Sequence, residues 1–153
     1  MDMQIALAPL CAQNMDRAAR LRVSDCQTAY VPDTAGIFAR AWAYRAQGAA
    51  LYVILASDAP VGLMLVYELE EAPACYCLME MMVDRSAQGR GVGAAALKLL
   101  IEKYSAAPRF PAMELAVRRE NLRARRVYEK AGFVDSGYVN PALPRYVNMV
   151  YRF

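Results

Sequence analysis

The stretch "MEMMVDRSAQGRGVGAAALKLLIEKY", residues 79–104, decides the fold of this chain. It begins with an apolar run that is typical of a strand and ends with an amphipathic run that is typical of a helix. Between the two runs, glycine occupies the alternate positions Gly89, Gly91 and Gly93. Glycine is unfavourable inside either element because its backbone loses the most conformational freedom on folding. Three glycines at such a junction indicate that something approaches the backbone closely there.

A glycine-rich loop that leads into a helix can bind an anion. The helix is predicted by apolar side chains at i, i+3, i+4 and i+7, which are Leu97, Leu100, Ile101 and Tyr104. The first N–H groups of such a helix have no partner within it, and they lie at the positive end of its dipole. The loop therefore favours a ligand that carries phosphate.

Two well-known phosphate-binding loops fit this stretch poorly. A P-loop ends in Gly-Lys-Ser/Thr, but Ala94 and Ala95 follow the last glycine, so this design is excluded. "GVGAAA" matches a dinucleotide-binding turn on paper, yet residues 85–88 separate it from the strand. The strands that precede it also resemble an antiparallel meander instead of a βαβ unit.

Residues elsewhere predict an α+β or mixed α/β domain around this strand–glycine–helix unit. The predicted strands are 3–8, 50–57, 60–70, 76–83, 112–119, 133–139 and 145–153. Helices are expected from Asn14 or Asp16 to about Val23, from Asp33 to about Arg45, after the glycines to Tyr104, and through Ala124, Val127, Tyr128 and Ala131 up to Gly132. The order is β-α-α-β-β-β-α-β-α-β-β.

The composition predicts one folded domain that spans residues 1–153. The chain is 58% hydrophobic and 22% charged, with a formal net charge of +3, and at this length it can bury a core without disulfides. Its longest apolar stretches fall short of the roughly 18 residues that a membrane span needs. Asp2 and Gln4 precede the N-terminal apolar run, where a signal peptide would carry positive charge. We therefore expect a cytoplasmic protein with no membrane partner.

Histidine is absent from the sequence. This excludes catalytic triads built on histidine and metal sites with histidine ligands, so a general base must be a carboxylate, a tyrosine, a lysine or a chain of waters. The cysteines contain no Cys-x-x-Cys pair and are expected to be reduced thiols, with no metal site. They are Cys11, Cys26, Cys75 and Cys77.

Positive charge is concentrated in "RRENLRARRVYEK", residues 118–130. Such a cluster is typical of a site for nucleic acid or for a polyphosphorylated small molecule, and it is equally compatible with a solvated helix face. The basic residues are Arg118, Arg119, Arg123, Arg125, Arg126 and Lys130. The charge by itself leaves these alternatives open.

Two motifs resemble the GNAT superfamily of N-acetyltransferases. "QGRGVG", residues 88–93, matches its Gln/Arg-x-x-Gly-x-Gly/Ala signature, and "ENLRARRVYEKAGF", residues 120–133, has Asn, Ala, Tyr and Gly-Phe in the family's order. "APVGLMLVYE", residues 59–68, resembles the family's third strand, and the order of elements is the family's order. The resemblance covers nearly the whole chain. It implies a mostly antiparallel sheet that is splayed between the strands at 76–83 and 112–119 and flanked by about four helices.

The resemblance further implies that acetyl-CoA is the cosubstrate and that no metal is needed. The pantetheine arm would pair with the backbone of residues 81–83, and the N–H groups of residues 89–94 would hold the pyrophosphate. Asn121 would bond to the pantetheine, and Arg90 is added because of its charge. The residues assigned to the cosubstrate are Met81, Met82, Val83, Gln88, Gly89, Arg90, Gly91, Val92, Gly93, Ala94, Asn121 and Ala124.

Acetyl transfer requires a neutral amine, a stabilised oxyanion and a protonated leaving thiolate. Direct attack by the amine in a ternary complex needs no enzyme nucleophile. The resemblance implies that a backbone N–H near Met82 stabilises the oxyanion and that Tyr128 is the general acid, although its place on an apolar stripe is equally typical of core packing. Glu80 is the candidate base because it is the only charged residue in its apolar run. Strand alternation alone would equally allow Glu80 to face solvent.

The acceptor is predicted to be a primary amine of a small molecule. "LRVSDCQTAYV", residues 21–31, with Gln27, Tyr30 and Val31, resembles the diamine, spermidine and spermine acetyltransferase branch. Acidic residues at 68–71 either attract a polycation or are simply a solvated strand end. Met79 stands where that branch often has a carboxylate, and the net positive charge does not attract polycations. A polyamine or diamine is therefore one candidate, beside an amino acid, an aminoglycoside or a peptide N-terminus.

Two other classes of function compete with the enzyme. One is a GNAT module that binds acyl-CoA without turnover, and the other is a nucleic-acid binder that uses residues 118–130. No aromatic side chains are interleaved with the basic ones there, since Tyr128 is predicted to face inward, so we expect no nucleic-acid partner. The resemblance implies a homodimer.

Overall fold

The computed structural model of the chain describes residues 3–153. They form a seven-stranded sheet with the strand order β1-β2-β3-β4-β5-β7-β6. The strands are β1 (Ile5–Pro9), β2 (Ala50–Ala56), β3 (Ala59–Leu69), β4 (Cys75–Val83), β5 (Ala112–Arg118), β6 (Val134–Asp135) and β7 (Tyr146–Arg152). The α-helices are α1 (Met15–Ala18), α2 (Thr34–Ala43), α3 (Val92–Ser105) and α4 (Leu122–Lys130), with short 3-10 helices at Asp25–Gln27 and Arg45–Gln47. The mixed α+β architecture predicted from the sequence is confirmed.

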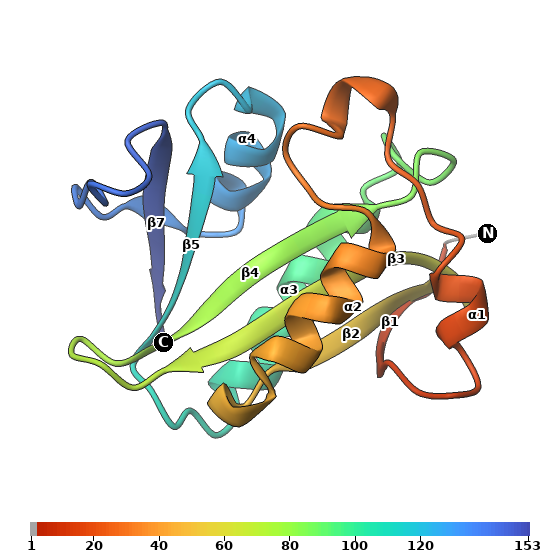
Figure 1. Cartoon of the computed structure of the whole chain (residues 1–153), viewed down its shortest axis with the longest axis horizontal. Helices are drawn as coiled ribbons and strands as arrows, with labels where there is room; N and C mark the ends of the chain where they lie inside the picture. The colour runs from red at the N-terminus through yellow and green to blue at the C-terminus, as the bar shows by residue number, and fades with distance from the viewer. Residues whose placement is uncertain (1–2) are drawn as a thin grey trace.

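Helices cover both faces of the sheet. Figure 1 shows α2 lying across one face of β2, β3 and β4, while α3 lies behind the same strands. In the apolar stripe of α3, Leu97 and Leu100 are fully buried in one core with Met64, Leu115 and Phe133. On the opposite face Ile37 of α2 packs with residues of α1, β2 and β3. Burial of these apolar surfaces on both faces is the main force that holds the layers together.

Strands β4 and β5 are parallel and diverge along their length. They pair only at Tyr76–Met113 and Cys77–Glu114, whereas β4 pairs with β3 in the antiparallel sense from Cys75 to Val83. In Figure 1, β5 and β7 lean away from the long β3–β4 pair. The predicted splay is therefore confirmed, and the second half of β4 has a free edge that faces the gap.

Strand β4 contains a bulge at Met79. Leu65 of β3 pairs with Glu80, but the next residue, Val66, pairs with Leu78, so Met79 has no partner. Before the bulge, Leu78 packs in the core beneath α3, and after it Met82 packs in the core beneath α2. A residue inserted in this way reverses the side-chain alternation. The bulge places Glu80 on the α2 face, away from Leu78.

Two elements are shorter than the sequence predicts. The first helix ends at Ala18 instead of about Val23. The Asn14 side chain does not cap it, because it accepts from the Cys11 N–H at 2.9 Å and donates to the Pro9 carbonyl at 3.0 Å. The strand predicted at 133–139 is reduced to β6, since Gly137 has a φ of 75° and its N–H donates to the Asp135 side chain. No helix within residues 3–153 is long and apolar enough to cross a membrane.

Candidate active site

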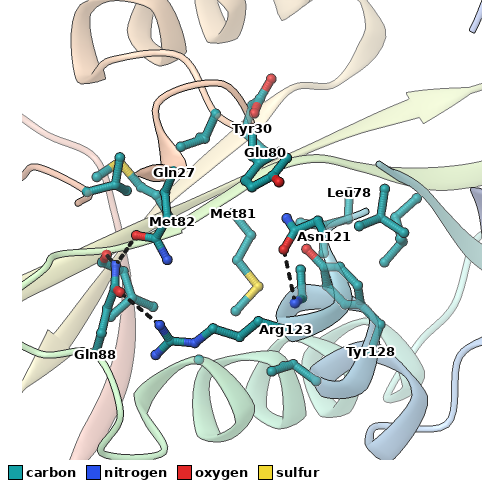
Figure 2. A pocket seen from close by; sticks show the side chains of 18 of the residues that line it. Gln27, Tyr30, Leu78, Glu80, Met81, Met82, Gln88, Asn121, Arg123 and Tyr128 are labelled. Carbon is teal, nitrogen blue, oxygen red and sulfur yellow. Dashed lines mark hydrogen bonds between the residues drawn. The ribbon is translucent and has the colours of Figure 1, made fainter. Parts of the chain in front are cut away.

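A cavity of about 430 Å³ lies in the gap between β4 and β5. Its walls come from the segment before α2, the second half of β4, the glycine loop, β5 and the start of α4 (Figure 2). Every residue that the sequence assigned to catalysis or to the cosubstrate lines it, except Arg90, which is exposed and lies outside the lining. The structure thus brings together residues from three separate stretches of the sequence.

The glycine loop has the features of an anion site. Gly89 and Gly91 have φ angles of 74° and 77°, and a Cβ added at either would meet nothing within 4 Å, so both are needed for their backbone conformation. Glycine is favoured at position 93 for a different reason. A Cβ there would lie only 3.3 Å from Met81 Cε, where α3 approaches β4. No side chain caps α3. Its first N–H groups therefore remain free for phosphate oxygens.

Asp84 fixes the start of this loop. Its carboxylate accepts from the backbone N–H of Arg22 at 2.7 Å and from that of Ser86 at 3.0 Å. Burial alone would raise the pKa of Asp84, but the hydrogen bonds from Ser86 and Arg22 outweigh burial and hold this pKa below its ordinary value. The ionised carboxylate thus ties the loop to the segment that precedes α2.

We expect Asp84→Asn to lower the free energy of unfolding by about 1 kcal/mol at pH 7, because it weakens charge-assisted hydrogen bonds that solvent partly screens. A depressed pKa contributes stability above the unfolded pKa, and that contribution disappears as the pH falls through the folded value. Urea unfolding should therefore show the difference from wild type shrinking below about pH 4. Asp58→Asn, in the exposed β2–β3 turn, is the control and should leave the free energy of unfolding at pH 7 unchanged.

Gln88 connects three segments around the cavity. Its amide nitrogen donates to the Val83 carbonyl at 2.9 Å and to Gln27 Oε1 at 2.7 Å. Its oxygen accepts from Arg123 Nη1 of α4 at 3.2 Å, a contact drawn in Figure 2. These bonds place one arginine of the basic run beside the glycine loop. On the same helix, Asn121 Oδ1 accepts from the Ala124 N–H at 3.3 Å and caps α4.

Tyr128 lines the cavity and also packs in the core. Its ring contacts Phe133, with centroids 6.0 Å apart, while it reaches the cavity from α4 (Figure 2). Burial, and then the nearby negative charge of Glu80, raise the pKa of Tyr128 to about 12. The phenol therefore keeps its proton at neutral pH. Tyr128 thus packs in the core and also lines the cavity, and its role as general acid stays a prediction.

Glu80 is buried, with 8% of its side chain exposed, so the alternative that it faces solvent is wrong. Arg40 Nη1 of α2 donates to Glu80 Oε1. Burial raises the pKa of this carboxyl, and the Arg40 guanidinium partly opposes the rise. The sequence did not identify Arg40, because a helix residue forty positions away gives no local signal of this contact.

Two further lining residues are Arg118, which the sequence named only as part of the basic run, and Tyr146, which it did not name. Arg118 ends β5, and Val117 before it packs beneath α3, so strand alternation turns Arg118 to the α2 face. Its guanidinium lies over the Tyr146 ring at 5.6 Å. The alternation of side chains along residues 112–119 could have predicted which face of the sheet Arg118 lies on. It could not have shown that the gap opens beside this residue.

The acidic residues at the end of β3 do not border the cavity. Glu68 and Glu70 both form ion pairs with Arg109. Glu68 is paired with Tyr76, at the end of β4 where β5 closes against it, whereas the cavity begins at Leu78. Of the two interpretations of residues 68–71, the structure therefore favours a strand end that lies away from the cavity. Within residues 3–153, no three His, Cys, Asp or Glu side chains are grouped to hold a metal ion.

Comparisons with known proteins place this geometry in context. Residues 16–133 match the family model described as "Acetyltransferase (GNAT) family". A search of the curated proteins found no match. Among solved structures, the aminoglycoside acetyltransferase AAC(6')-Ib in complex with coenzyme A is 20% identical, with a TM-score of 0.77 over 97% of this chain and 95% of its own.

Two further solved structures have the same fold. Spermidine N-acetyltransferase from Vibrio cholerae, in complex with CoA and spermine, is 16% identical, with a TM-score of 0.73 over 97% of this chain and 95% of its own. RimJ from Mycobacterium smegmatis, in complex with CoA-disulfide, is 19% identical, with a TM-score of 0.75 over 97% of this chain and 81% of its own. At such identities the likeness concerns the fold.

Proposed function

Because the chain belongs to the acetyltransferase (GNAT) family, we propose that it transfers an acetyl group from acetyl-CoA to a primary amine of a small molecule. One observation carries the proposal. A single cavity joins the uncapped N-terminus of α3 at one end to Glu80 and Tyr128 at the other. An anion site and an acid–base pair in one cleft are what a phosphate-bearing acyl donor and an amine acceptor need.

The residues of the cleft fit coenzyme A. The free N–H groups of α3 and the left-handed glycines at 89 and 91 leave open space for a pyrophosphate. The β4 edge that β5 leaves unpaired, from Leu78 to Val83, suits an extended pantetheine arm that hydrogen-bonds like an added strand. Arg123 lies beside the glycine loop through Gln88, where its charge would meet a phosphate. Acetyl-CoA supplies the activated thioester.

The acid–base chemistry then uses two side chains. The amine attacks the thioester carbonyl directly, so a C–N bond forms and the C–S bond breaks. Glu80, in its ionised form, accepts the proton that the amine must lose, through direct contact or one water. Tyr128, which is protonated at neutral pH, donates a proton to the departing thiolate. A backbone N–H of β4 near Met82 stabilises the oxyanion.

The charges of the cleft bear on which amine is used. The sequence resemblance favours a polyamine or diamine, and the Vibrio cholerae enzyme of this fold was solved with spermine. Of the charged residues that line the cavity here, however, Glu80 is negative while Arg118 and Arg123 are positive. A polycation would be repelled more than it is attracted. An acceptor with fewer positive charges is therefore favoured over a polyamine.

Two measurements test the proposal. Calorimetry measures the binding of acetyl-CoA, and thiol release measures turnover with diamines, polyamines, amino acids, aminoglycosides and peptides. We expect binding in the micromolar range and turnover with at least one acceptor. Binding without turnover on any acceptor would instead support an acyl-CoA-binding module. The homodimer and the cytoplasmic location stay predictions of the resemblance, which gel filtration and cell fractionation test.

A further inference from the structure

The one carboxylate in the cavity lining already has a cationic partner. Glu80 is 8% exposed and Arg40 is 50% exposed. Arg40 is not one of the lining residues, but it contacts Glu80 from α2, and part of its side chain is in solvent. Only its Nη1 is engaged, by Glu80 Oε1, and within residues 3–153 no other hydrogen bond from this guanidinium is formed. The Nε and Nη2 atoms are thus free to bind an acceptor's oxygen atoms. A guanidinium presents its donors as a planar fork that matches a carboxylate.

A second arginine lies on the same face of the sheet. Arg118 lines the cavity from β5, opposite β4. Its Nε is 3.0 Å from Glu120 Oε1, yet this contact lacks hydrogen-bond geometry and the Nε is otherwise without a partner. Glu80 is therefore paired with Arg40 of α2, and Arg118 adds a second positive charge to the lining of the same cavity.

This arrangement limits what can bind beside Glu80. An ammonium group that approaches the carboxylate must share it with Arg40, and each additional positive charge on the acceptor is repelled by the arginines. An acceptor that carries a carboxylate on the same carbon as its amine avoids the conflict. Its amine can face Glu80 while its carboxylate meets the free donors of Arg40, so that every charge has an opposite neighbour.

We propose that the acceptor is a zwitterionic amino acid, whose amino group is acetylated beside Glu80 while its carboxylate is bound by Arg40. The inference rests on the proposed function, because it names the substrate class of that same reaction. Arg40 is then a specificity-determining residue. The sequence resemblance to polyamine enzymes does not lead to this class. The choice of a zwitterionic amino acid follows from the ion pair between Arg40 of α2 and Glu80 of β4.

The test compares acceptors that differ only in the carboxylate. Suitable pairs are alanine with ethylamine, phenylalanine with 2-phenylethylamine, and ornithine with 1,4-diaminobutane, and phenylalaninamide adds a neutral acceptor of the same size. We expect wild type to use the carboxylate-bearing member with a kcat/KM at least about tenfold higher, since a charge-assisted pair contributes at least that much. In Arg40→Gln the preference should fall to about twofold or less, mainly through a higher KM for the amino acid.

Control variants separate this effect from general damage. Arg45→Gln changes an arginine just past α2 whose guanidinium lies over the Trp42 ring at 3.9 Å, away from the cavity, and it should keep the preference. Arg40→Lys should keep part of it. A wild type that uses the amines without a carboxylate as well as the amino acids overturns the inference while the acetyltransferase stands. Acetyl-CoA binding without turnover on either member of any pair overturns this inference, and the proposed function then stands or falls with the polyamines, aminoglycosides and peptides of the wider panel.

Discussion

Tyr128→Phe is expected to lower kcat about 100-fold or more, with little change in the affinity for acetyl-CoA. The variant removes one hydroxyl that lines the cavity and keeps the ring that packs on Phe133. A positioned general acid contributes about 10²–10⁴ to the rate. Because the pKa of Tyr128 is raised to about 12, wild type should hold its proton throughout the neutral and mildly alkaline range. Steady-state kinetics and calorimetry with acetyl-CoA measure the two quantities.

Tyr151→Phe is the matched control for this change. Tyr151 packs on the same Phe133 ring, with centroids 5.6 Å apart, but it does not line the cavity. It should therefore retain the kcat of wild type. An equal loss in both variants would mean that the hydroxyls act through the core. A Tyr128→Phe enzyme with unchanged kcat would remove Tyr128 from the acid role.

Gly91→Ala is expected to weaken acetyl-CoA binding about tenfold to a hundredfold. A left-handed φ of 77° disfavours alanine by about 1–2 kcal/mol, so the loop should relax and turn its N–H groups from the phosphate position. Loss of one charge-assisted bond to phosphate corresponds to a change of this size. Calorimetry with acetyl-CoA and with free coenzyme A measures it, and the two should weaken equally because the acetyl group lies at the other end of the cavity.

Gly137→Ala supplies the same backbone strain at a remote position. Gly137 has a φ of 75°, and a Cβ there would also meet nothing within 4 Å, but it lies between β6 and β7 and does not line the cavity. Both variants should lose similar stability on thermal melting, and only Gly91→Ala should lose affinity. If Gly91→Ala binds acetyl-CoA as wild type does, the glycine loop is not the phosphate site.

Local patterns in the sequence were sufficient for the architecture and for most of the cleft. Helical and strand periodicity gave the complete order of elements, because burial on one face fixes the period of each segment. The resemblance that the glycines and the 120–133 motif carry implied most of the residues that line the gap, and the glycines themselves reflect the left-handed backbone of the loop. Asn121 caps α4 as its position suggests, and Tyr128 lies where the motif places it.

Contacts between distant segments decided the rest. The periodicity of the sequence does not predict the bulge at Met79, which turns Glu80 to the α2 face. Without the bulge, strand alternation would have placed Glu80 on the same face as Leu78, beneath α3. The ion-pair partners of the acidic residues could not be predicted from the sequence either, because Arg40 and Glu80, and likewise Arg109 and Glu68, are about forty positions apart. The sequence thus determined most of the residues that surround the cleft, although not Tyr146. Only the tertiary structure decided their charge balance, because ion pairing depends on which segments pack side by side.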